Sequence, residues 1–133
     1  MLFMKEHVAK QARRAKEASR KLALVPAEVR DAALMAMAEA LEAKQEEILE
    51  VNAKEVATAK EKGTRSNMID RLTLTPKRIA DMAEGIRQVV NLPDPLGKFD
   101  IDTTRPNGLR IRRVKVPFGV VGIIYEARPD VTA

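Results

Sequence analysis

Residues 116–132 read V-P-F-G-V-V-G-I-I-Y-E-A-R-P-D-V-T, and this stretch decides the fold. Its apolar residues, Val120, Val121, Ile123 and Ile124, are all β-branched and do not alternate with polar residues. Such a run is typical of a strand that is covered on both faces, as strands in parallel sheets are. The stretch therefore predicts an α/β protein. The alternative is a complete helical domain that ends in an apolar tail.

A polar cluster follows the predicted strand directly. Glu126, Arg128 and Asp130 come at its carboxyl end, which is where open α/β sheets bind ligands. Pro129 has a fixed φ that suits the first turn of a following helix. A parallel strand also needs a crossover and a second strand beside it. We therefore expect these 133 residues to be the N-terminal part of a larger α/β protein.

Composition excludes several kinds of site. The chain has no cysteine and one histidine, so it contains no disulfide, no thiolate metal site, no thiol nucleophile and no histidine-rich metal site. No stretch approaches the roughly 20 apolar residues of a membrane span, and the start lacks a signal-peptide core, so a cytoplasmic protein is expected. The net charge of +5 keeps a helical interaction or nucleic-acid-binding module open as an alternative.

The first 91 residues have the periodicity of helices. Apolar positions predict amphipathic helices over residues 5–24, over a segment that Pro26 opens, and over a segment that Gly63 ends. In the second helix the expected packed face is Val29, Ala33, Leu34, Met37, Ala40 and Leu41. Asn52 is expected to mark a kink or a new helix start, because Glu55 follows it at the spacing of a capping box.

The clearest helix start lies at Thr75-Pro76. A short helix or turn is expected over residues 66–72. After it, Thr75 has the character of a cap, and Pro76 fits the first turn of a helix that Asn91-Leu92-Pro93 ends.

A turn-rich linker, residues 92–97, precedes two predicted strands over residues 99–104 and 109–116. Asn107-Gly108 between them is a strong hairpin signal. The apolar positions of the second strand change parity across Arg112-Arg113, which predicts either a β-bulge there or a strand that leaves one partner for another. The basic residues of this strand could bind phosphate, but we expect them to form an exposed face or a subunit contact. They are Arg110, Arg112, Arg113 and Lys115.

Four segments, taken in order, resemble the gamma-glutamyl phosphate reductase family of the aldehyde dehydrogenase superfamily. They are N-A-K-E-V-A at 52–57, D-R-L-T-L-T-P at 70–76, I-R-Q-V-V-N-L-P-D-P-L-G at 86–97, and the stretch from Pro117 to Thr132. The resemblance implies an aldehyde-dehydrogenase-like α/β fold. Residues 1–97 would form an N-terminal helical segment, 98–117 a hairpin of the oligomerisation type, and 118–133 the start of the NADP-binding domain, with the first strand of its sheet.

The resemblance also implies an activity. The family reduces L-glutamyl 5-phosphate to glutamate 5-semialdehyde with NADPH, in proline biosynthesis, through a cysteine thiolate that this chain lacks. These residues alone are therefore expected to be inactive, and the complete protein to be a homo-oligomer that binds neither nucleic acid nor membrane. Another member of the superfamily, with a different substrate, is the alternative.

By the position of the motif, the segment after Gly122 should line the cofactor and substrate cleft. Arg128 is the candidate for substrate binding, facing the substrate's carboxylate or its phosphate, unless it pairs with Glu126 or Asp130. Tyr125 and Glu126 are the candidates for cofactor binding. Asp130 lies near the position of a superfamily asparagine that stabilises an oxyanion, but an ionised carboxylate cannot donate that hydrogen bond. A helix cap is the expected role of Asp130 instead.

Overall fold

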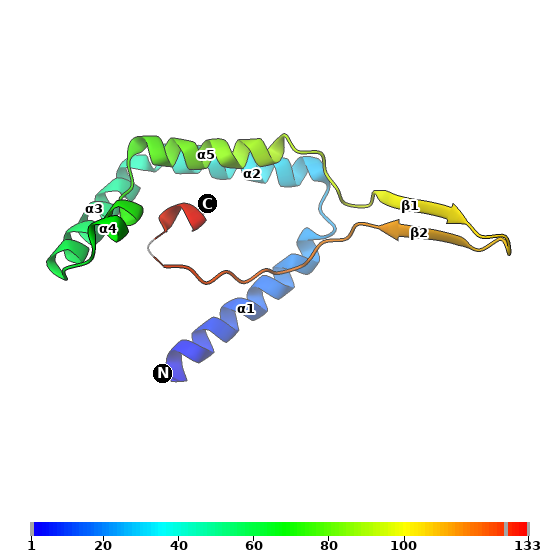
Figure 1. Ribbon diagram of the computed structural model, residues 1–133, viewed down its shortest axis with the longest axis horizontal. Helices are drawn as coiled ribbons and strands as arrows, with labels where there is room; N and C mark the ends of the chain where they lie inside the picture. Colours follow the sequence, from blue (N-terminus) through cyan, green and yellow to red (C-terminus); the bar gives the residue numbers. More distant parts are fainter. Residues whose placement is uncertain (1, 127, 133) are drawn as a thin grey trace. The chain divides into compact units, whose positions relative to one another are not determined.

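A computed structural model describes residues 2–126 and 128–132. In chain order it contains helices α1 (Leu2–Leu22), α2 (Ala27–Ala43), α3 (Gln45–Glu61), α4 (Ser66–Leu72) and α5 (Pro76–Val90), then strands β1 (Phe99–Thr104) and β2 (Arg110–Val114). A 3-10 turn, η1 (Pro129–Thr132), follows (Figure 1). Helices together with a two-stranded sheet confirm the predicted α/β class.

The chain divides into two compact units. One holds residues 1–27 and 93–122, and therefore α1 and the hairpin. The other holds residues 28–92 and 123–133, and therefore the remaining helices and η1. The predicted division by chain order, at residues 97 and 117, stays a prediction about the organisation of the complete fold.

The helical unit has a small core where α2 packs against α5. Ala38, Ala83 and Ile86 form it, with Leu34 and Leu41 partly buried against them. The predicted packed face of α2 is therefore only half right, since Leu34 and Leu41 pack against the core but Met37 is 51% exposed. α2 carries two adjacent apolar stripes, and the one with Ala38 packs against Ala83 and Ile86 of α5.

Local signals set the ends of the helices. Thr75 caps α5 by accepting a hydrogen bond at Oγ1 from the Arg78 backbone N–H at 3.1 Å, and Pro76 is the first residue of that helix, as predicted. Gly63, just past α3, has a φ of 71°, a left-handed conformation that favours glycine. Asn52 does not kink α3, which runs unbroken from Gln45 to Glu61.

The unit that holds α1 also contains the antiparallel hairpin of β1 and β2. Its register pairs Thr104 with Arg110 and Phe99 with Val114. The turn at Asn107-Gly108 is confirmed, with the Gly108 N–H donating to the Arg105 carbonyl at 2.9 Å. The bulge lies in β1, between Phe99 and Ile101, and not at Arg112-Arg113 as predicted. When the apolar side chains of one strand switch faces, an extra residue in the facing strand can accommodate the switch equally well. Here that extra residue is Asp100.

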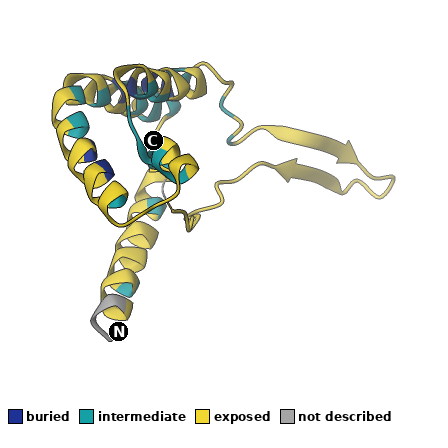
Figure 2. Cartoon of the chain, turned by 60° about the vertical axis from the view of Figure 1, so that its left-hand side comes forward, coloured by how far each residue is buried: buried dark blue, intermediate teal, exposed yellow. Residues whose placement is uncertain are grey.

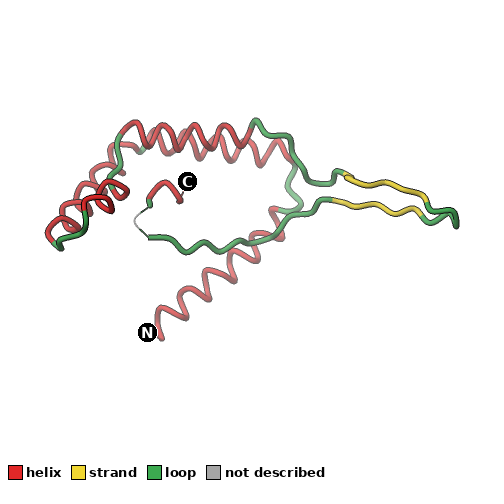
Figure 3. Tube along the Cα trace, viewed as in Figure 1, coloured by secondary structure: helices red, strands yellow, loops and turns green. Residues whose placement is uncertain are grey.

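The stretch from Lys115 to Ile124 forms no strand, contrary to expectation. It is drawn as a loop in Figure 3. Val121 is 69% and Ile123 65% exposed, and the Ile124 side chain is fully exposed. A strand exists only when a neighbour completes its hydrogen bonds, and the backbone of residues 120–124 has no such neighbour among the described residues.

Burial is concentrated in the helical unit. Figure 2 shows dark blue residues on its helices and only exposed residues along both strands. None of the described helices is long and apolar enough to cross a membrane.

Candidate functional site

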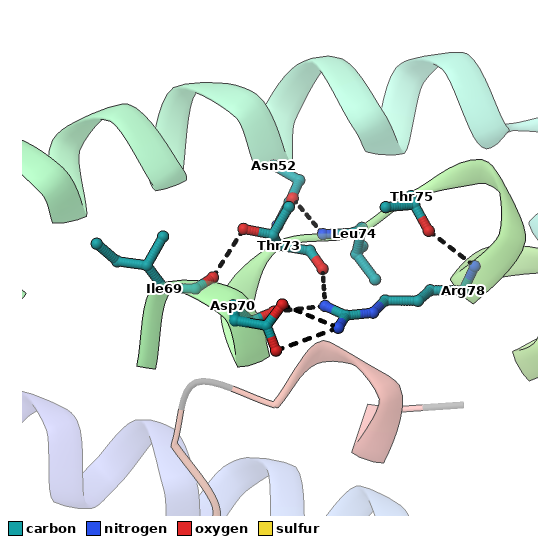
Figure 4. A network of polar contacts seen from close by, with 7 residues as sticks. All are labelled: Asn52, Ile69, Asp70, Thr73, Leu74, Thr75 and Arg78. Atoms are coloured by element: carbon teal, nitrogen blue, oxygen red, sulfur yellow. Dashed lines mark hydrogen bonds and ion pairs between the residues drawn. The ribbon is translucent and has the colours of Figure 1, made fainter. Parts of the chain in front are cut away.

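The loop between α4 and α5 is held by Asn52, which projects from the middle of α3. Its side-chain Nδ2 donates to the Leu72 carbonyl at 2.9 Å, and its Oδ1 accepts from the Leu74 N–H at 2.7 Å (Figure 4). Asn52 is only 6% exposed, and both of its polar groups are used in this clamp. The amide therefore serves a segment about twenty residues further along the chain, and not its own helix end. This is why the predicted kink is wrong.

Arg78 fixes the same loop from the other side. Its Nη1 donates to the carbonyls of Asp70 and Thr73, the latter at 2.5 Å. Its Nη2 lies 3.2 and 3.3 Å from the two carboxylate oxygens of Asp70. The end of α4 and the start of α5 are thus joined through one guanidinium (Figure 4). The structure brings together the N-A-K-E-V-A and D-R-L-T-L-T-P segments, which lie apart in the sequence.

A cleft of about 400 Å³ opens beside this network, between α4, α5 and the residues around η1. Arg128 and Asp130 line one side of it, and the ribbon of η1 runs next to Asp70 and Arg78 in Figure 4. The complete lining is Asp70, Arg71, Leu74, Arg78, Asp81, Met82, Arg128, Pro129 and Asp130.

The charges of this cleft fall into two groups. Asp70 is paired with Arg78, and the Asp81 carboxylate lies 2.8 Å from the Lys77 ammonium. Arg71, Arg128 and Asp130 make no ion pair or side-chain hydrogen bond with any residue that the structure describes. The cleft therefore offers two uncommitted guanidinium groups and one uncommitted carboxylate.

The candidate residues of the signature stretch lie in different places. Arg128 lines the cleft, and its alternative, an ion pair with Glu126 or Asp130, is not formed. The Tyr125 hydroxyl lies 2.6 Å from the Thr132 hydroxyl, a contact that spans η1. Glu126 is exposed, and neither Tyr125 nor Glu126 lines this cleft.

Asp130 is not a helix cap. It is the second residue of η1, and the turn is closed by the Val131 N–H donating to the Arg128 carbonyl at 3.1 Å. Because Pro129 already opens the turn, the Asp130 carboxylate lies past the position where a cap acts.

A more apolar cleft of about 470 Å³ adjoins the charged one. Leu74, Met82 and Pro129 belong to both linings. The other residues of the apolar cleft are Met37, Ala40, Leu41, Lys44, Ile48, Ile86 and Thr132. Apolar side chains thus separate the charged cleft from the core.

The described residues do not by themselves form a nucleotide site. A dinucleotide pyrophosphate is usually held where a glycine turn leads from a strand into the N-terminus of a helix. Here residues 120–126 are exposed and form neither strand nor helix, and η1 is a turn of four residues. No group of three or more His, Cys, Asp or Glu side chains in the described residues could hold a metal ion.

The four basic residues of β2 and of the residue after it share two aspartates. Asp102 accepts two hydrogen bonds from Arg110, at 2.7 and 2.6 Å, and lies 3.3 Å from Arg112. Asp100 lies 3.3 Å from Arg113 and 3.4 Å from Lys115. The hydrogen bonds from Arg110 hold the pKa of the Asp102 carboxyl below its ordinary value. Two carboxylates shared by four cations leave this face with a net positive charge, so the predicted exposed face or subunit contact stays a prediction.

One further ion pair links α2 to α5. Glu42 accepts two hydrogen bonds from the Arg87 guanidinium, at 2.9 and 2.5 Å. These bonds lower the pKa of Glu42 and raise that of Arg87. Neither residue of the pair lines the charged cleft.

Sequence reasoning missed Asn52, Asp70, Arg71 and Arg78 as parts of the site. A signal was present, because these residues belong to two of the four segments on which the family resemblance rests. The resemblance showed the order of these segments along the chain. It did not show which of their side chains are in contact.

Comparisons with known proteins agree with this resemblance. The family model for the aldehyde dehydrogenase family matches residues 2–125. A gamma-glutamyl phosphate reductase of Mesorhizobium japonicum is 52% identical over 91% of this chain, and one of Moorella thermoacetica is 55% identical over 90% of it. The chain spans 28% of the length of each.

Solved structures give the same result. The crystal structure of gamma-glutamyl phosphate reductase from Thermotoga maritima matches 93% of this chain, and 30% of its own, with a TM-score of 0.88 and 40% identity. The enzyme from Saccharomyces cerevisiae matches 91% of this chain, and 31% of its own, with a TM-score of 0.85 and 34% identity. The resemblance to this group of reductases is confirmed, and the chain belongs to the aldehyde dehydrogenase family.

Proposed function

We propose that this chain is the N-terminal part of a gamma-glutamyl phosphate reductase, which reduces L-glutamyl 5-phosphate to L-glutamate 5-semialdehyde with NADPH in proline biosynthesis. The observation that carries the proposal is the similarity to reductases of this name, at 52% and 55% identity over nine-tenths of the chain. The cleft that Arg128 lines supports it, because the substrate is an anion at both of its ends.

The chemistry needs a group from outside these residues. A thiolate attacks the acyl phosphate, phosphate leaves, and a thioester results, whose reduction gives the aldehyde and returns the thiolate. NADPH would supply the hydride for that reduction. Since these 133 residues contain no cysteine, the thiolate must come from another part of the protein, and the chain alone would be inactive.

The described residues would bind and orient the substrate. A guanidinium is a fixed cation that can bind a carboxylate or a phosphate through two parallel hydrogen bonds, and Arg128 would do this in the cleft. Tyr125 and Glu126 would contribute to the rim of the cofactor site. The Tyr125–Thr132 hydrogen bond, at 2.6 Å, would hold that rim against η1.

The organisation of the complete protein follows from the same proposal. Residues 1–97 would form the helical segment, residues 98–117 an oligomerisation hairpin of a homo-oligomer, and residues 118–133 the start of the NADP-binding domain. The exposed apolar side chains of the hairpin, such as Phe99 at 51% and Leu109 at 58%, suit such a contact. The expected location is the cytoplasm.

The test is an assay of the complete protein with glutamyl phosphate and with simple aldehydes, each with NADPH and with NADH. We expect turnover with glutamyl phosphate and a preference for NADPH. Turnover of simple aldehydes alone would identify a different member of the superfamily. Purified protein of residues 1–133 should show no turnover.

A further inference from the structure

The uncommitted charges of the cleft match the amino-acid end of the proposed substrate. We propose that Arg71 and Arg128 bind its α-carboxylate, and that Asp130 binds its α-ammonium group. This assignment rests on the proposed function, which requires an amino-acid substrate, and it adds the residues that select for one. The cleft would thus recognise the end of the substrate that does not react.

Arg71 is available because it bonds to no carboxylate among the described residues, and two carboxylates of the cleft, Asp70 and Asp81, are paired with other cations. Its neighbour Asp70 accepts two hydrogen bonds at its carboxylate from Nη2 of Arg78, at 3.2 and 3.3 Å. Asp81 is held by Lys77 one turn earlier in α5, at 3.0 and 2.8 Å. An arginine that lines a cleft without a protein anion is a ready partner for an anionic ligand.

Asp130 supplies the opposite charge. It lines the same cleft as the two arginines, is exposed, and has no side-chain partner among the described residues. An ionised carboxylate only accepts hydrogen bonds, so its natural ligand is a donor such as an ammonium group. Two guanidinium groups and one carboxylate in one cleft therefore fit a carboxylate and an ammonium group on the same carbon.

The rest of the lining suits the substrate's methylene groups. Leu74 and Met82 lie between the charged residues and the adjoining apolar cleft. The volume of about 400 Å³ is within the range of roughly 300 to 1,000 Å³ that is usual for small-molecule sites. The acyl end of the substrate would point out of this cleft, toward the thiolate that other residues supply.

The experiment runs the proposed reaction in reverse: the complete enzyme oxidises each of two aldehydes with phosphate to an acyl phosphate, and NADP+ accepts the hydride. One is glutamate 5-semialdehyde, and the other is 5-oxopentanoate, which has the same chain and carboxylate but no amino group. The variants are Asp130→Asn and Arg71→Gln. Arg65→Gln is the matched control, because Arg65 is an exposed arginine just before α4 that does not line the cleft.

We expect Asp130→Asn to lower kcat/KM for the amino substrate about tenfold or more and to leave the value for 5-oxopentanoate within about twofold. Arg71→Gln should raise KM about tenfold for both aldehydes, since both carry the carboxylate. Arg65→Gln should change neither. Thermal melting of each variant checks that the exposed substitutions leave the fold intact.

Two different failures can be told apart. If the unmodified enzyme oxidises neither glutamate 5-semialdehyde nor 5-oxopentanoate, the proposed function is wrong, and this assignment is wrong with it. If the enzyme is active but Asp130→Asn keeps the full preference for the amino substrate, or Arg71→Gln behaves like the Arg65 control, the cleft assignment alone is overturned.

Discussion

Replacing Asn52 with alanine should loosen the α4–α5 loop and lower the free energy of unfolding. The substitution removes a donor that lies 2.9 Å from the Leu72 carbonyl and an acceptor that lies 2.7 Å from the Leu74 N–H. Both backbone groups lie in a partly buried place, so water replaces these bonds only incompletely. No other side chain among the described residues bonds to these two groups.

The magnitude follows from two opposing effects. A buried polar group left without a partner costs about 1 to 3 kcal/mol, and partial access of water puts the two groups together near 2 kcal/mol. Alanine in place of asparagine inside α3 returns about 0.5 kcal/mol through its higher helix propensity. We therefore expect a net loss of about 1.5 kcal/mol.

Two measurements check this prediction. Urea unfolding followed by circular dichroism gives the change in unfolding free energy. Amide hydrogen exchange reports on the bond itself, because the Leu74 N–H donates to Asn52. We expect the protection of the Leu74 amide to fall by at least about tenfold, which is the effect of losing roughly 1.4 kcal/mol locally.

Asn67→Ala is the matched control. Asn67 is an exposed asparagine of α4 whose side chain has no partner among the residues that the structure describes, so only the propensity gain remains. The variant should be as stable as the original or slightly more stable. If Asn52→Ala changes the unfolding free energy by less than about 0.5 kcal/mol, the value usual for surface substitutions, the clamp does not hold the loop.

Three further substitutions and one pH change test the fold. Gly85→Ala should stabilise by about 0.5 to 1 kcal/mol, because Gly85 lies inside α5 with open space where a Cβ would go. Gly108→Ala should destabilise the hairpin by about 1 kcal/mol, because Gly108 has a φ of 82°. Ile79→Ala should cost about 2 to 5 kcal/mol, because Ile79 is completely buried. Because Arg110 lowers the pKa of Asp102, the pair stabilises the hairpin above the ordinary carboxyl pKa, and this contribution is lost as the pH falls through the lowered value.

Each of these predictions has its own check. The two glycine variants should shift the urea midpoint in opposite directions, and a shift in the same direction would contradict the backbone argument. For Ile79, the control is Val89→Ala on the exposed side of the same helix, at 53% exposure, which should cost much less. For Asp102, carboxyl NMR shifts should show titration below pH 3.8, the ordinary value, and an Arg110→Gln variant should move it back toward that value.

The sequence predicts well what neighbouring residues decide. Thr75-Pro76 and Gly63 set helix ends through their own backbone and side-chain chemistry, and Asn107-Gly108 sets the hairpin turn in the same way. Arg128 is also predicted from its neighbours in the sequence, because it directly follows an apolar run at an edge where ligands bind. The structure shows that Arg128 lines a cleft. Its role in binding substrate stays a prediction.

Partners that lie far apart in the sequence could not be predicted. The spacing of Asn52 and Glu55 also fits a capping box, and only the fold shows that Asn52 reaches the loop after α4. Met37 and Ala38 are adjacent on α2, and periodicity does not say which of their two stripes meets α5.

The run from Val120 to Ile124 shows a different kind of failure. Its β-branched residues favour a strand whose faces are buried against other segments. They do not show which segments bury it. The structure therefore keeps the predicted α/β class while leaving this run exposed and unpaired among the described residues.

The many bonds of Arg78 imply a low tolerance for substitution at an otherwise accessible position. Its side chain is 41% exposed, which usually marks a site where lysine and arginine exchange freely. Here the planar guanidinium donates hydrogen bonds to two carbonyls and a carboxylate at once. A lysine has a single ammonium group and could not make all of these bonds in the same geometry. The planar shape of the guanidinium, and not its charge alone, should therefore restrict this position to arginine in proteins that keep the same α4–α5 loop.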